Sequence, residues 1–222
     1  MVAHIARTGE IEEWVSHQLS AAMSEPSHDL LGAVAEGVKS EAFSEVEAVV
    51  ILHTLLSAGG ESTTSLIGNA VRILAEDREL QNRLRESPEL IPMFVEEALR
   101  LEPPFRYHMR HVPHDTELGG VEIPAGATVL LLWGAANRDS AMFDHPESID
   151  LSRDAPRRHV AFGRGFHHCV GAPLARVEAK NVLRVLLART SQITLDPQRQ
   201  PKWVNSLMVR RHEQLPVRLV AF

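Results

Sequence analysis

The stretch from Phe162 to Arg176 reads FGRGFHHCVGAPLAR, and the interpretation of the whole chain starts from it. Gly163 and Gly165 permit the positive φ angles that a tight backbone loop needs directly before Cys169. We expect the chain to continue as a helix from Ala172 to Arg189. Cys169 therefore precedes a helix N-terminus, where free N–H groups and the positive end of the helix dipole favour a thiolate over a thiol.

Cys169 is the only cysteine in the chain. A single cysteine forms no internal disulfide, which fits a reducing cytoplasm. Without further context, a lone intracellular cysteine is most often an ordinary buried thiol. Here many residues around the cysteine match one sequence motif within a short window, and this argues against an ordinary buried thiol.

The window resembles the cysteine-ligand loop of cytochromes P450, F-G-x-G-x-H-x-C-x-G-x-x-L-A-R, and matches every fixed position. The resemblance implies that Cys169 is the thiolate ligand of a haem b iron, where it favours cleavage of the O–O bond of bound dioxygen. It also implies that His167 donates to a haem propionate. Phe162, Gly163 and Gly171 would contact the haem, with Gly171 letting the backbone approach the flat cofactor closely.

A second family motif, E-x-x-R, occurs as Glu97-Ala98-Leu99-Arg100. Residues three apart share a helix face, so Glu97 and Arg100 can form an ion pair. Alone, such a pair is usually solvated at the surface; the resemblance implies that here it locks the core behind the haem. The later Arg110 matches the family arginine that binds a haem propionate, with a plain surface arginine as the alternative. The residues from Asn137 to Arg153 resemble the stretch leading into the family's meander loop, a structural role.

A third motif, Ala58 to Thr63, reads AGGEST and resembles the family pattern A/G-G-x-D/E-T. Gly59 and the glycine after it cost a helix roughly 2 kcal/mol relative to alanine, and the resemblance implies that they let the helix open beside the oxygen site. Glu61 matches the acid of a proton relay. Ser62 takes the alcohol position, where threonine is usual; Thr63, about 100° further around the helix, is the other candidate. Alternatively, Ser62 only bonds back to helix carbonyls.

The periodicity of the sequence predicts a mainly α (α+β) fold with small antiparallel sheets. Helices are expected over 10–23, from Asp29, from the Ser44 capping box to about Glu76, over 77–86, 92–101 and 172–189, with strands in 105–133 and after 190. The long helix ending near Glu76 is apolar on several sides in its first half, which predicts a central, buried position.

The resemblance covers only the C-terminal half of a typical family member. We therefore expect a single domain over 1–222 that is a truncated cytochrome P450 with the haem-binding half of the fold. A fragment, a short reading frame and one half of a split protein are open origins. Apolar faces meant for the absent helices would favour a dimer or the missing N-terminal half as a partner.

Composition excludes several classes of partner. The chain has 222 residues and a net charge of −6, which disfavours a duplex-binding surface, so we expect no nucleic-acid partner. The longest apolar stretch, Ala48 to Ala58, is too short to span a bilayer, and the first residues lack the apolar core of a signal peptide. We expect a cytoplasmic protein without a membrane partner.

Substrate contacts are less clear from the sequence. The resemblance implies that residues between Pro104 and Arg110 line the substrate pocket. Arg106 and His108 there indicate a polar or acidic substrate, with the alternative that either side chain points away from the pocket. His108 belongs to a set of histidines three residues apart, which cannot converge on a metal from one strand because alternate residues face opposite sides.

The function implied by the resemblance is a monooxygenase that inserts one atom of O2 into a small organic substrate. A ferredoxin-like or flavodoxin-like donor would supply electrons at a basic face around the cysteine loop, comprising Arg164, Arg176, Lys180 and Arg184. A solvated helix face with internal ion pairs is the alternative for these residues. Two other functions stay open: a haem-binding module or peroxide-using peroxidase, and a haem-free helper protein.

Overall fold

The computed structural model describes residues 2–25, 27–154 and 156–222. Packing separates the chain into two compact units, one up to Glu61 and one from Ser62 to Phe222. The boundary falls inside α3 (Glu45–Glu76), which is a continuous helix across it. The prediction of one domain over 1–222 therefore stays a prediction. Within the described ranges, no helix combines the length and apolar character needed to cross a membrane.

The first unit consists of α1 (Val2–Ser24), α2 (Leu30–Lys39) and the first half of α3. Asp29 caps α2, since its Oδ1 accepts a hydrogen bond from the Gly32 N–H at 2.8 Å. The capping box predicted for α3 is confirmed, with the Ser44 N–H donating to Glu47 Oε2 at 2.7 Å and the Glu47 N–H to Ser44 Oγ at 3.3 Å. The core contains Leu19, Ala22, Val34, Ala35 and Ala48.

The first half of α3 lies at the surface, so the prediction that it is buried is wrong for this chain. Val46 is 74% exposed, Val50 59% and Leu56 50%. The reason is that the core of the first unit takes up a single side of the helix, at Ala48 and its neighbour Val49. Leu52 also packs against this core, whereas Val46, Val50, Ile51 and Leu56 are exposed.

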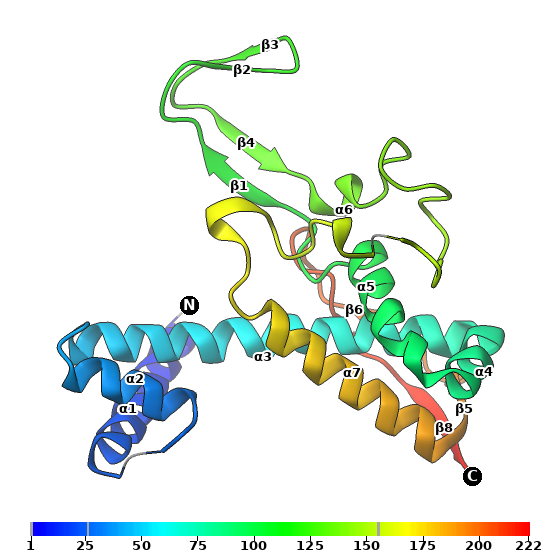
Figure 1. Ribbon diagram of the computed structural model, residues 1–222, viewed down its shortest axis with the longest axis horizontal. Helices are drawn as coiled ribbons and strands as arrows, with labels where there is room; N and C mark the ends of the chain where they lie inside the picture. Colours follow the sequence, from blue (N-terminus) through cyan, green and yellow to red (C-terminus); the bar gives the residue numbers. More distant parts are fainter. Residues whose placement is uncertain (1, 26, 155) are drawn as a thin grey trace. The chain divides into compact units, whose positions relative to one another are not determined.

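The second unit is built on the second half of α3, α4 (Arg78–Glu86), α5 (Ile91–Leu101) and α7 (Ala172–Arg189). A 3-10 turn (Pro88–Leu90) joins α4 to α5. In Figure 1, α5 and α7 lie near each other, and both contribute to the main core. These helices confirm the predicted ones to within two residues at each end. Their shared core contains Leu66, Leu74, Leu84, Ile91, Phe94, Leu99, Leu183, Leu187 and Ile193.

Four two-stranded antiparallel sheets complete the described part of the second unit and confirm the predicted small sheets. They pair β1 (His108–His111) with β4 (Thr128–Leu131), β2 (Thr116–Leu118) with β3 (Val121–Ile123), β5 (Thr190–Leu195) with β8 (Val217–Ala221), and β6 (Lys202–Trp203) with β7 (His212–Gln214). The strand predicted through Trp133 ends at Leu131, because Trp133 begins the short helix α6 (Trp133–Ala136).

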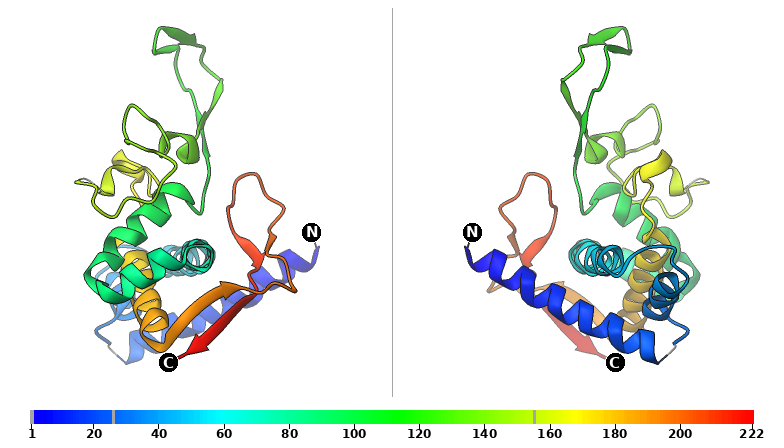
Figure 2. Two further views of the ribbon diagram at one scale, coloured as in Figure 1. Left: turned by 90° about the vertical axis from the view of Figure 1, so that its right-hand side faces the viewer. Right: turned by 90° about the vertical axis from the view of Figure 1, so that its left-hand side faces the viewer.

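The hairpin β2–β3 continues from the far end of β1 and β4 and projects away from α4, α5 and α7, as both Figure 1 and Figure 2 show. The near end of β1 and residues 137–154 lie near α5 instead, and residues 156–171 lead to the start of α7. Residues 137–154 and 156–171 are irregular, and the helical segments within these described ranges are short 3-10 turns at Pro156–Arg158 and Gly165–His167. Cys169 lies near the end of this stretch, three residues before α7 begins at Ala172, as the sequence predicts.

Candidate active site

Cys169 is presented by a tight loop that the sequence explains residue by residue. Gly163 and Gly165 have φ angles of 69° and 71°, the left-handed conformation that glycine adopts without a steric cost. The loop is closed by the Cys169 N–H, which donates to the Phe162 carbonyl at 2.9 Å. A Cβ atom at position 171 would lie 3.8 Å from Cys169 Sγ, which is an ordinary van der Waals distance. The backbone of Gly171 therefore lies close to the sulfur without a steric clash. Cys169 itself is free and exposed, which contradicts the interpretation as an ordinary buried thiol.

A cavity of about 220 Å³ adjoins this loop within the second unit. Apolar side chains form most of its wall, and Ser62, His108, Arg110 and His167 are the polar exceptions. The structure thus brings together six of the predicted site residues. The lining residues are Ser62, Leu66, Leu99, Pro104, Phe105, His108, Arg110, Trp133, Ala161, Phe162, Gly163, His167, Cys169 and Ala175.

The wall suits a flat, apolar cofactor with anionic edge groups. The sulfur of Cys169 is uncommitted to any disulfide and accessible to an iron atom. The Arg110 guanidinium donates to the Met109 carbonyl at 2.8 Å, and among the described residues no carboxylate pairs with it. It and His167 are therefore available for carboxylates such as haem propionates. The residues present fit a haem.

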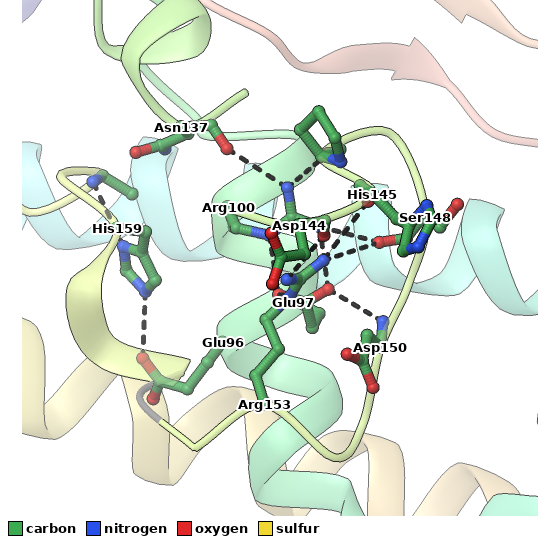
Figure 3. A network of polar contacts seen from close by, with 12 residues as sticks. Glu96, Glu97, Arg100, Asn137, Asp144, His145, Ser148, Asp150, Arg153 and His159 are labelled. Carbon is green, nitrogen blue, oxygen red and sulfur yellow. Dashed lines mark hydrogen bonds and ion pairs between the residues drawn. The ribbon is translucent and has the colours of Figure 1, made fainter. Parts of the chain in front are cut away.

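Glu97 and Arg100 form a fully buried ion pair, so the alternative of a solvated surface pair is wrong. Arg100 Nε lies 2.6 Å from Glu97 Oε1, and Arg100 Nη2 lies 2.8 Å from Oε2, with both residues 0% exposed. Figure 3 shows Arg100 reaching the carbonyls of the irregular stretch, including those of Asn137 and Ser148. Through these hydrogen bonds the pair connects that stretch to α5, and its role behind a haem stays a prediction.

Arg153, which the sequence placed at the end of the meander-like stretch without a partner, is a third member of this group. Its Nε lies 3.1 Å from Glu97 Oε1, and the Asp150 N–H donates to Oε2 at 2.9 Å. Burial raises the pKa of Glu97, but the hydrogen bonds from Arg100 and Asp150 outweigh it, and the pKa lies below its usual value. The carboxylate is therefore charged, as the surrounding donors require.

Glu96, the neighbour of Glu97 on α5, is a further buried carboxylate that sequence reasoning missed. Arg176 binds it through two hydrogen bonds of 2.7 and 2.9 Å, and His159 Nε2 lies 3.0 Å from it. Burial raises the pKa of Glu96, whereas the hydrogen bonds from His159 and Arg176 lower it, and the balance is about 2. The only signal in the sequence is a second carboxylate beside the E-x-x-R motif, on a helix that is otherwise buried.

This contact corrects the interpretation of Arg176 as part of a basic docking face. Its side chain is 19% exposed and committed to Glu96, so the alternative of internal pairing holds for this residue. Arg164 and Arg184 are exposed, and Lys180 is partly exposed. These three cations are the members of the predicted basic face that remain accessible around the cysteine loop.

Ser62 and Thr63 have different environments. Ser62 lines the cavity with Cys169, whereas Thr63 is 9% exposed and is absent from the cavity wall. Glu61 precedes Ser62 on α3 and is exposed. The expected opening of the helix at Gly59 is not seen: α3 is regular there, and Gly59 is exposed with open space around its Cβ position among the described residues.

Two residues expected to contact substrate face different cavities. His108 lines the cavity beside Cys169, whereas Arg106 lines a second cavity of about 720 Å³ together with Tyr107, Leu207 and Arg210. Arg106 therefore does not line the cavity beside Cys169, and its contact with a substrate stays a prediction. His108 Nδ1 accepts a hydrogen bond from Trp133 Nε1 at 2.7 Å. Burial and then the charge of Arg110 lower the pKa of His108, so its ring is neutral near pH 7.

A cysteine loop beside an apolar cavity with a cationic group at its edge fits a haem-like cofactor, and the chain is similar to proteins of one family. The family model for cytochrome P450 matches residues 88–216. Cytochrome P450 144 of Mycobacterium tuberculosis is 47% identical over 206 residues, which cover 93% of this chain and 47% of that protein. The mycinamicin IV hydroxylase/epoxidase of Micromonospora griseorubida is 42% identical over 197 residues, covering 87% of this chain and 49% of that protein.

Solved structures agree with these matches. Substrate-free cytochrome P450 CYP150A6 of Mycobacterium marinum superposes with a TM-score of 0.90 at 31% sequence identity, covering 98% of this chain and 56% of that one. The chain belongs to the cytochrome P450 family, whose members use a haem-thiolate cofactor. It spans about half the length of the curated relatives it matches.

Proposed function

We propose that this chain binds haem b through Cys169 and forms the oxygen-activating half of a monooxygenase. Its reaction would insert one atom of O2 into a small organic substrate, with electrons from a ferredoxin-like or flavodoxin-like donor. The observation that carries the proposal is the exposed sulfur of Cys169 on one apolar cavity with Arg110, His167 and Ser62. When bound, the haem iron supplies the binding and activation of dioxygen.

The residues of this chain have separate tasks around the cofactor. Cys169 is the iron ligand. Arg110 and His167 hold the propionates by charge and hydrogen bonding. Phe162 and Gly163 form the wall against the macrocycle, and Gly171 keeps the space beside the sulfur small but open.

Proton delivery is assigned to Ser62 with Glu61. Ser62 lines the cavity and its hydroxyl can donate a proton there, and a carboxyl at the preceding position can return one to it. The choice of Ser62 over Thr63 is supported by burial, since Thr63 is 9% exposed and does not line this cavity.

The substrate class follows from the lining. The cavity is mostly apolar, and His108 adds one polar contact. Because the indole N–H of Trp133 can only donate, His108 Nδ1 accepts, and the hydrogen of the neutral ring lies on Nε2. We infer an apolar organic substrate with a hydrogen-bond acceptor near this imidazole. A relative named as a hydroxylase/epoxidase is consistent with that class.

A haem-dependent peroxide reaction is the second candidate. The exposure of Cys169 favours it, since a wet site protects an activated oxygen poorly. The haem-free helper function is disfavoured, because Cys169, Arg110 and His167 converge on one cavity without another evident task.

The test is the spectrum of the purified chain supplied with hemin, reduced and exposed to carbon monoxide. A strongly red-shifted Soret band that is lost in Cys169→Ala supports thiolate ligation. A band at the ordinary position in the unmodified chain contradicts the proposal. Product formed with an electron donor and O2, against product formed only with peroxide, then separates the two reactions.

A further inference from the structure

Glu96 does not line the cavity beside Cys169, but both of its carboxylate oxygens have defined partners. The residue is 4% exposed, and both carboxylate oxygens accept short hydrogen bonds. Oε1 lies 2.7 Å from Arg176 Nε, and Oε2 lies 2.9 Å from Arg176 Nη2 and 3.0 Å from His159 Nε2. Arg157 approaches only to 3.8 Å and is 74% exposed, so it adds little. A buried carboxylate is tolerated only with such partners, which means that Glu96 constrains both of them.

The first constraint acts on Arg176. Two parallel hydrogen bonds fix the plane of a guanidinium as well as its position. The carbon at the centre of that plane lies 4.6 Å from the centre of the Phe162 ring, a cation–π contact. Glu96 therefore determines, through Arg176, where the Phe162 ring forms the cavity wall.

The second constraint acts on His159. The Ala161 N–H donates to His159 Nδ1 at 3.2 Å, so this nitrogen is an acceptor and the hydrogen of the ring lies on Nε2. That hydrogen is directed to Glu96, as Figure 3 shows for the His159–Glu96 contact. Glu96 thus also fixes the backbone at Ala161, the residue directly before Phe162.

The constraints continue to the sulfur-bearing residue. The Phe162 carbonyl accepts the hydrogen bond from the Cys169 N–H at 2.9 Å and closes the loop. We propose that Glu96 is a positioning residue for Cys169. It holds the Arg176 guanidinium against the Phe162 ring, and it holds the His159 ring in place to accept the hydrogen bond from the Ala161 N–H. Together these contacts fix the loop that presents the sulfur to the cavity. The role of the sulfur as iron ligand rests on the proposed function, whereas the positioning itself does not.

Hydrogen exchange of the haem-free full chain tests the positioning directly. In Glu96→Gln, which keeps the shape and removes the charge, the Cys169 amide should exchange roughly tenfold faster, in excess of any change in β5. Glu178→Gln is the matched control, because Glu178 is exposed on α7 and carries the same charge. Acceleration at Cys169 no greater than in β5 would mean that Glu96 only stabilises the fold, and would overturn the proposal.

The route through Arg176 is tested by a double-mutant comparison. If Glu96 acts through this arginine, Glu96→Gln combined with Arg176→Gln should expose the Cys169 amide no more than the stronger single variant. Additive effects would overturn that route. If Glu96→Gln does not fold, Arg176→Lys carries the same comparison, since lysine keeps the charge and loses the two-pronged contact.

A spectroscopic readout connects the positioning to the cofactor. With hemin and carbon monoxide, Glu96→Gln should lower the fraction of protein with the red-shifted Soret band, while Glu178→Gln should match the unmodified chain. An equal fraction in both variants would overturn the proposal. If the unmodified chain lacks that band, the proposed function fails, and the exchange experiment still decides the positioning.

Discussion

At the scale of single residues, the cavity beside Cys169 receives one hydroxyl from α3 and one imidazole from β1. Ser62 replaces the threonine that is usual in the resembled motif, and its side chain faces the cavity while Thr63 does not. Serine keeps the proton of the hydroxyl but lacks the methyl group that restricts the χ1 rotation of threonine. A proton donor at this position therefore works with less defined geometry.

The Ser62 hydroxyl should affect how much of the electron consumption leads to formation of product. In the haem-loaded protein, Ser62→Ala should release a several-fold larger share of its electrons as hydrogen peroxide, because the proton at the cavity wall is gone. Ser62→Thr should release no more than the unmodified protein. Peroxide formed per electron consumed is the measurement, with Thr63→Val as the control. A rise in the control equal to that in Ser62→Ala would assign the relay to neither hydroxyl.

At the scale of elements, local signals predicted most helices because their ends are coded by neighbouring residues. Asp29, Ser44 and Asp77 each precede a helix, and each side chain bonds an N–H of the first turn. Such contacts span three residues and are readable in the sequence. The burial of the first half of α3 was predicted wrongly, since burial depends on what packs against a helix and not on its own pattern.

The helix α3 also yields a prediction at Gly59. The structure shows regular helix there and open space around the Cβ position among the described residues. Gly59→Ala should therefore raise the free energy of unfolding, by up to about 1 kcal/mol, because alanine loses less backbone entropy in a helix. Urea denaturation measures this, with Gly126→Ala, at a φ of 82°, as a control that should destabilise. Destabilisation by Gly59→Ala would show instead that this position needs a non-helical conformation.

At the scale of the whole molecule, the cysteine loop could be predicted from the sequence, whereas the distant side chains that hold it in place could not. The loop is one continuous window, so its glycines and Cys169 could be interpreted together. Glu96 meets His159 and Arg176 across 63 and 80 residues of sequence, and no spacing rule links such distant positions. The same holds for Arg153, which reaches Glu97 from 56 residues away. Contacts of this range follow from the fold and cannot be derived from a pattern.

A buried histidine shows how such long-range packing controls stability. His212 on β7 stacks on Trp203 with ring centres 3.7 Å apart, and neither of its ring nitrogens has a hydrogen-bond partner among the described residues. Burial and then the charges of Arg72 and Arg210 lower its pKa from 6.5 to about 4, with Glu102 opposing. The folded chain therefore holds His212 neutral at pH values where the unfolded chain protonates it.

The sign of the pH effect follows from proton binding. Between pH 6.5 and pH 4 the unfolded state binds more protons at His212, so the free energy of unfolding should decrease as the pH falls through this window. The loss is on the order of 2–3 kcal/mol. His212→Phe keeps the ring on Trp203 and removes the titration, so urea denaturation at pH 7 and pH 4.5 should differ less in this variant than in the unmodified chain. His111→Gln, at an exposed position, is the control and should leave the difference unchanged. An equal pH dependence in His212→Phe would show that other groups cause the acid sensitivity; Glu96, with a pKa of about 2, acts mainly below this window.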